Sequence, residues 1–85
     1  MVHLIGFARL DCPQASSFQA LYRPGDICVF TDQGLLLAGT LTLQGDGYCL
    51  HHEQITPAAG CTLPTLDHNG LLDLVAESGP CTSWY

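Results

Sequence analysis

Positive charge is nearly absent from this sequence. Its 85 residues include no lysine and only two arginines, Arg9 and Arg23, against eight acidic residues, so the formal net charge is -6. Proteins that bind nucleic acids displace counterions from the phosphates with cationic side chains. We therefore expect no direct binding of DNA or RNA.

Long hydrophobic runs are also missing. No apolar stretch approaches the roughly 20 residues that a membrane-spanning helix needs. The first residues lack the basic region and long apolar run of a signal peptide. The five cysteines are an odd number, so at least one thiol stays unpaired. We expect a cytoplasmic protein without membrane contact, because a reducing compartment keeps such thiols free.

Apolar side chains, by contrast, are plentiful. They make up 47% of the sequence, which is normal for a globular core. The length predicts a single domain over 1–85, near the lower limit of what folds alone. Since charged residues are few, we expect part of the surface to be buried against other subunits in an oligomer.

Strand and helix patterns alternate along the chain. Strands are predicted over 2–7, 26–31, 48–51 and 62–66, and helices over 14–22, 35–43, 52–60 and 70–78. The helix over 35–43 is ambiguous, because Gly39 and two threonines oppose it. This order predicts an α/β fold, a small parallel-sheet domain with helices on both faces. Ligands of such folds usually bind beyond the carboxyl ends of the strands, here the segments 7–12, 31–34, 51–53 and 66–68.

Two thiols are candidates for reactivity. Cys12 precedes the first predicted helix and follows Arg9 by three residues, and both features lower the pKa of a thiol. Cys81 lies in the tail that follows the last predicted helix, where it could be exposed. Cys28, in contrast, lies among apolar strand residues, which predicts a buried and inert thiol. The same reasoning applies to Cys49.

A metal site is an alternative reading of the segment from Cys49 to Cys61. His51 and His52 complete a possible ligand set with these two cysteines. Structural zinc sites, however, normally pair their ligands two to four residues apart on a turn, and this spacing does not. We therefore expect neither a metal nor another cofactor.

Four segments in order resemble the DsrH/TusB family of sulfur-relay subunits. They are 1-MVHL-4, 25-GDICVFTDQG-34, 48-YCLHHEQITPAAG-60 and the closing 83-SWY-85. The family-motif and interface residues carried over are His3, Phe18, Asp32, Gly34 and Trp84. Gln33 stands at the family's usual Asp, and Ala59 at its usual Arg.

The resemblance implies a DsrE/F/H-like fold and assembly with DsrE/TusD-like and DsrF/TusC-like subunits. Such complexes pass persulfide sulfur between sulfur-carrier proteins, for tRNA wobble-uridine 2-thiolation or for cytoplasmic sulfur oxidation. DsrH-type members have a cysteine in the first helix, where this chain has Phe18. The resemblance is therefore to TusB-type members, which lack that thiol.

Three hypotheses follow. The leading one is a non-catalytic accessory subunit of a sulfurtransferase complex. The second is a sulfurtransferase that carries persulfide on its own Cys12 or Cys81. The third is a small metal-binding module built on the segment from Cys49 to Cys61.

Overall fold

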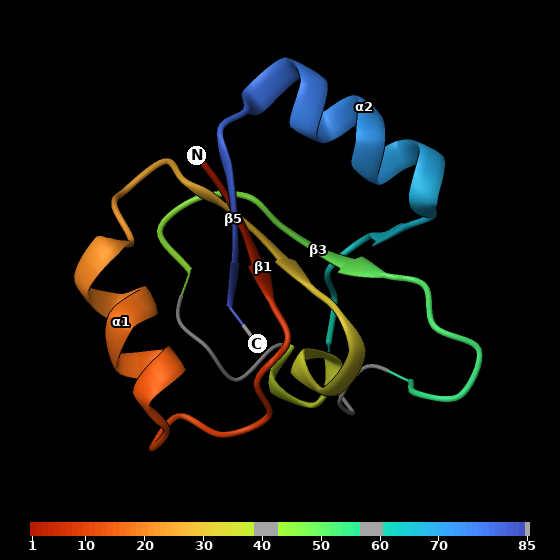
Figure 1. Cartoon of the computed structure of the whole chain (residues 1–85). Coiled ribbons are helices and arrows are strands. Elements are labelled where there is room, and N and C mark those ends of the chain that lie inside the picture. The colour runs from red at the N-terminus through yellow and green to blue at the C-terminus, as the bar shows by residue number, and fades with distance from the viewer. Residues whose placement is uncertain (39–42, 57–60, 85) are drawn as a thin grey trace.

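Five strands and two α-helices organise the domain (Figure 1). The structure is a computed structural model and describes residues 1–38, 43–56 and 61–84. The strands are β1 (Val2–Ile5), β2 (Ile27–Phe30), β3 (Gly47–Leu50), β4 (Thr65–Leu66) and β5 (Cys81–Trp84). The helices are α1 (Pro13–Leu21) and α2 (His68–Ser78), with a 3-10 helix, η1 (Asp32–Leu37).

All five strands are parallel and form one sheet in the order β4-β3-β2-β1-β5. From β1 to β4, each strand pairs with the one before it, so the sheet grows toward one edge. β5 pairs with the other side of β1, where Trp84 lies opposite Ile5. The crossovers through α1 and α2 therefore run in opposite directions across the sheet (Figure 1). The predicted α/β domain with a parallel sheet is confirmed.

The sheet face under α1 carries the main core. Side chains alternate between the two faces along each strand, so Ile5, Phe30 and Cys49 lie on one face, in the same buried cluster as Ala15 and Phe18 of α1. The buried members of this cluster are Ile5, Phe7, Ala15, Phe18, Cys28, Phe30, Leu35, Ala38 and Cys49. Val2 and Val29 point to the opposite face and are also fully buried. A large apolar side chain contributes about 1.5–3 kcal/mol when fully buried, so this cluster supplies much of the folding energy.

The bounds of both α-helices lie within two residues of the predicted ranges, 14–22 and 70–78. Pro13 is the first residue of α1. The N–H groups in the first turn of a helix have no partner within the helix, so the N–H that proline lacks is not missed there. The side chain of Asp67 caps α2 by accepting a hydrogen bond from the Gly70 amide at 2.7 Å. Gly79 and Pro80 then end α2 before β5 begins.

The structure differs from the predicted pattern in three places. Residues 81–84 were expected to be a tail but form β5, which pairs with β1. Residues 52–56 form no helix, and the rest of that predicted helix, 57–60, lies outside the described residues. The ambiguous helix over 35–43 is a 3-10 helix up to Leu37, and 39–42 again lie outside the described residues. β4 lies at one edge of the sheet, directly after Pro64, which has no N–H to donate to a neighbouring strand.

Candidate functional site

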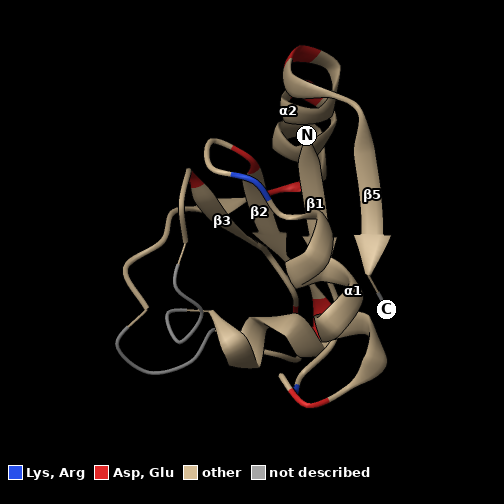
Figure 2. Cartoon of the chain, turned by 90° about the vertical axis from the view of Figure 1, so that its left-hand side faces the viewer, with Lys and Arg blue, Asp and Glu red and all other residues tan. Residues whose placement is uncertain are grey.

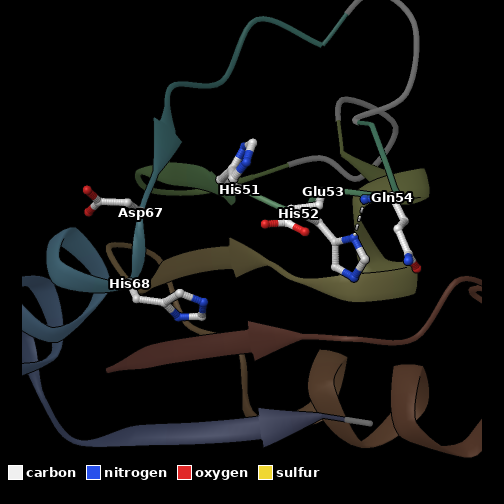
Figure 3. Close-up of a pocket in the computed structure, with 6 residues that line it drawn as sticks. All are labelled: His51, His52, Glu53, Gln54, Asp67 and His68. Atoms are coloured by element: carbon white, nitrogen blue, oxygen red, sulfur yellow. Dashed lines mark hydrogen bonds between the residues drawn. The ribbon is translucent and has the colours of Figure 1, made fainter.

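A pocket of about 330 Å³ opens beyond the carboxyl ends of β3 and β4. Four of its lining residues follow β3 and two lie at the junction of β4 and α2, as Figure 3 shows. They are His51, His52, Glu53, Gln54, Asp67 and His68. The pocket therefore lies on two of the segments that the sequence places at the functional end of the sheet.

His52 is held in one orientation by its backbone and by η1. Its Nδ1 accepts hydrogen bonds from the amides of Gln54 and Ile55, at 3.0 and 3.1 Å. Its Nε2 lies 3.5 Å from Oδ1 of Asp32. A neutral imidazole with an accepting Nδ1 carries its hydrogen on Nε2, so this N–H faces the Asp32 carboxylate. In this tautomer the ring lone pair is on Nδ1 and already accepts two amide hydrogen bonds, so it is not free to act as a general base.

Asp32 and Gly34 shape the corner between β2 and η1. Asp32 has a φ of 49°, in the left-handed region that few residues other than glycine adopt. Gly34 is buried against β1, and a Cβ at this position would overlap the carbonyl of Ile5. Only glycine therefore permits η1 to pack this closely on β1.

His3, Phe18 and Trp84 come together at the side of the sheet covered by α1. The imidazole of His3 is fully buried and lies edge-on to the Phe18 ring at a centroid distance of 5.2 Å. The indole Nε1 of Trp84 donates to Nδ1 of His3 at 3.0 Å. On its other side, Nε2 of His3 lies 2.9 Å from Oδ2 of Asp26. An accepting Nδ1 places the ring hydrogen on Nε2, where it is donated to Asp26.

The role of Asp26 was not found from the sequence. Its carboxylate accepts from His3, from the Arg23 amide at 3.1 Å and from the amino group of Met1 at 3.3 Å. The hydrogen bond from His3 is the main reason that the pKa of Asp26 lies below its usual value. The hydrogen-bond partners of Asp26 are 3 to 25 residues away in the chain, so local sequence does not identify them. The turn at Pro24 is the only local sign that the aspartate faces inward.

The two candidate reactive thiols lie apart from each other. Cys12 precedes α1, and its thiol donates to the Arg9 carbonyl at 3.1 Å. The Arg9 guanidinium instead forms a two-pronged ion pair with Asp11, at 3.0 and 2.7 Å, so its charge is shared with a carboxylate rather than directed at Cys12. Cys81 is exposed at the amino end of β5, the opposite end of the sheet from the pocket. Desolvation raises the pKa of the Cys81 thiol.

Cys28 and Cys49 are fully buried, as predicted for both. Burial raises the pKa of the Cys28 thiol to about 11, so it stays protonated and unreactive at neutral pH. Cys49 differs in one respect that the sequence did not reveal. Its sulfur lies 3.7 Å from that of Cys61.

The metal-binding alternative finds no support in the described part of the chain. No group of three or more His, Cys, Asp and Glu side chains within 1–38, 43–56 and 61–84 is arranged to hold a metal ion. The cysteines Cys49 and Cys61 contact each other, whereas His52 accepts two amide hydrogen bonds on Nδ1 and has Nε2 3.5 Å from Asp32. Among the same residues, no helix is long and apolar enough to span a membrane.

No family model matches the chain, and a search of curated proteins finds no match.

Proposed function

We propose that this chain is an accessory subunit of a DsrH/TusB-type sulfur-relay complex, with a DsrE/F/H-like fold. The observation that carries the proposal is the environment of Phe18. The position where DsrH-type subunits have a helix cysteine is filled here by a phenylalanine with 1% exposure, packed between His3, Tyr22 and Trp84. The parallel α/β sheet is compatible with this proposal, in which the Phe18 position serves packing instead of sulfur transfer.

The surface supports a protein partner. Five large apolar side chains are exposed in the described residues, namely Met1, Leu10, Leu21, Leu36 and Leu72. The two arginines lie at opposite ends of the sheet, Arg23 before β2 and Arg9 after β1, so they form no basic patch (Figure 2). A surface that is poor in positive charge and partly apolar suits contact with other subunits better than contact with RNA.

In this proposal the chemistry belongs to the partners. A DsrE/TusD-like subunit supplies the cysteine that accepts sulfur, and a DsrF/TusC-like subunit completes the hetero-oligomer in the cytoplasm. The present chain positions that cysteine and excludes water around it. The sulfur then goes to tRNA thiolation or to sulfur oxidation, through sulfur-carrier proteins.

Co-expression with the DsrE- and DsrF-type subunits of the same genome tests the proposal. The affinity tag belongs on a partner, because the amino group of Met1 contacts Asp26. We expect size-exclusion chromatography with light scattering to detect a complex that contains all three chains. A chain that stays monomeric and is captured by neither partner would refute the proposal.

Charged substitutions then locate the contact. Leu21→Glu alters α1, Leu36→Glu alters η1 and Leu72→Glu alters α2, and all three side chains are at least half exposed. We expect each variant to fold and at least one to leave the complex, while a variant on a free face stays bound as the matched control. Retention of all three variants would show that these apolar side chains do not form the interface.

A further inference from the structure

Cys49 and Cys61 form a pair of thiols in contact. Their sulfur atoms are 3.7 Å apart, close to van der Waals separation, and neither is in a disulfide. A disulfide requires a sulfur–sulfur distance of about 2.05 Å, so a shift of less than 2 Å would close the bond. The other three thiols lie elsewhere: Cys12 bonds to a carbonyl, Cys28 is in the core beside Tyr22, and Cys81 is exposed on β5.

The pairing of β3 with β4 brings the two thiols together. Cys49 lies within β3, and its amide donates to the carbonyl of Pro64 at 2.9 Å. Pro64 is only three residues beyond Cys61, in the segment that leads into β4. The strand ladder therefore fixes the backbone of Cys49 and anchors the chain three residues beyond Cys61.

The two thiols differ in their access to solvent. Cys49 is fully buried, whereas Cys61 is partly exposed in a segment without helix or strand. A cavity of about 130 Å³ also borders Cys49, with Leu35, Leu50 and Ile55 among its lining residues. A reagent from solution thus reaches Cys61 first, and the cavity provides room for the sulfur of Cys49 to move.

The electrostatics of the pair agree with this order of reaction. Burial, and then the neighbouring Cys61, raise the pKa of the Cys49 thiol to about 12. The thiolate is the nucleophilic form of cysteine, so Cys49 is the poorer nucleophile toward an external reagent. Once Cys61 has reacted, however, Cys49 attacks a sulfur in direct contact, and the high effective concentration offsets its small thiolate fraction.

We infer that Cys49 and Cys61 are a redox-active dithiol whose oxidant is a low-molecular-weight disulfide. In the first step the Cys61 thiolate attacks the disulfide, forming a mixed disulfide and releasing one thiolate. In the second step the Cys49 thiolate attacks Cys61 Sγ, forming the Cys49–Cys61 disulfide and releasing the second thiolate. Two protein thiols are oxidised, one external disulfide is reduced to two thiols, and the two released thiolates take up the two protons that the protein thiols lose. This inference does not depend on the proposed function.

Oxidised glutathione is the probe. The reduced protein is incubated with it, quenched with acid and alkylated with N-ethylmaleimide under denaturing conditions. We expect the number of alkylated cysteines to fall from five to three, with the monomer retained on a non-reducing gel. Cleavage at Glu53, which lies between the two cysteines, should leave a linked pair of peptides that reduction separates.

Three variants make the test specific. Cys81→Ser removes the exposed thiol and should leave the Cys49–Cys61 bond intact. Cys49→Ser should stop at a stable glutathione adduct on Cys61. Cys61→Ser should form no internal disulfide. Because the Cys61 side chain is only partly buried, we expect this variant to fold, so it tests the pair even if Cys49→Ser does not fold.

The rate of ring closure adds a second readout. Because burial raises the pKa of the Cys49 thiol, closure from the mixed disulfide should speed up as the pH rises from 7 to 9. A glutathione adduct that persists on Cys61 in the native sequence would overturn the inference. So would a disulfide that joins any other pair of cysteines, or five free thiols after oxidation.

Discussion

Replacing Phe18 with alanine tests the cluster on which the proposed function rests. The ring of Phe18 lies 5.0 Å from that of Tyr22 and 6.2 Å from that of Trp84, measured between centroids, and it is 1% exposed. Truncating a buried phenylalanine to alanine costs about 3–5 kcal/mol, from lost transfer energy and the cavity left behind. A small domain loses about 2 kcal/mol of stability per molar guanidinium chloride, so the unfolding midpoint should fall by about 1.5–2.5 M.

The assay is guanidinium unfolding followed by far-ultraviolet circular dichroism. Leu21→Ala is the matched control, because Leu21 lies on the same helix but is 51% exposed, and should change stability by less than about 0.5 kcal/mol. A domain of this length has a total stability of about 4–13 kcal/mol, so Phe18→Ala could leave too little to measure. Phe18→Leu then provides a milder loss of about 1–2 kcal/mol. Equal midpoints for the Phe18 and Leu21 variants would refute the placement of Phe18 in the core.

Three further predictions concern other parts of the domain. Gly34→Ala should lower the free energy of unfolding by about 1–3 kcal/mol, measured in the same denaturant, because the added Cβ overlaps the Ile5 carbonyl. The lowered pKa of Asp26 stabilises the fold above the pKa of the unfolded state, and this contribution is lost as pH falls through the folded-state pKa. Thermal unfolding between pH 5 and 2 should therefore be less pH-dependent for Asp26→Asn, and an unchanged slope would contradict this. Iodoacetamide at pH 8 should modify Cys81 in the native protein but Cys28 only after denaturation, as peptide mass mapping would reveal.

The elements that the sequence predicts correctly are those with strong local signals. The continuous apolar run of β2 identifies a strand covered on both faces, and Pro13 and Asp67 mark the starts of α1 and α2. The pocket also lies where a parallel sheet places it, because the carboxyl ends of the strands share one edge. These features depend on residues close together in the chain.

What the sequence does not reveal depends on contacts between distant residues. β5 is four residues long and largely polar, and it becomes a strand only because β1 offers it a free edge. The contact of Cys49 with Cys61 depends on the register between β3 and β4. Likewise, nothing near Asp26 in the chain indicates that a buried imidazole 23 residues earlier will bond to it.

The pairing of β5 with β1 has a consequence for how the domain folds during its synthesis. β1 leaves the ribosome before β5, and this second neighbour of β1 is complete only after residue 84 has emerged. Until then β1 is an open edge, and closing the sheet requires a contact across 81 residues, which slows folding. Trp84 is the only tryptophan in the chain. Its indole donates a hydrogen bond to His3 between β5 and β1, the last pair of strands to form. Its fluorescence is therefore a natural reporter of the moment when the sheet is completed.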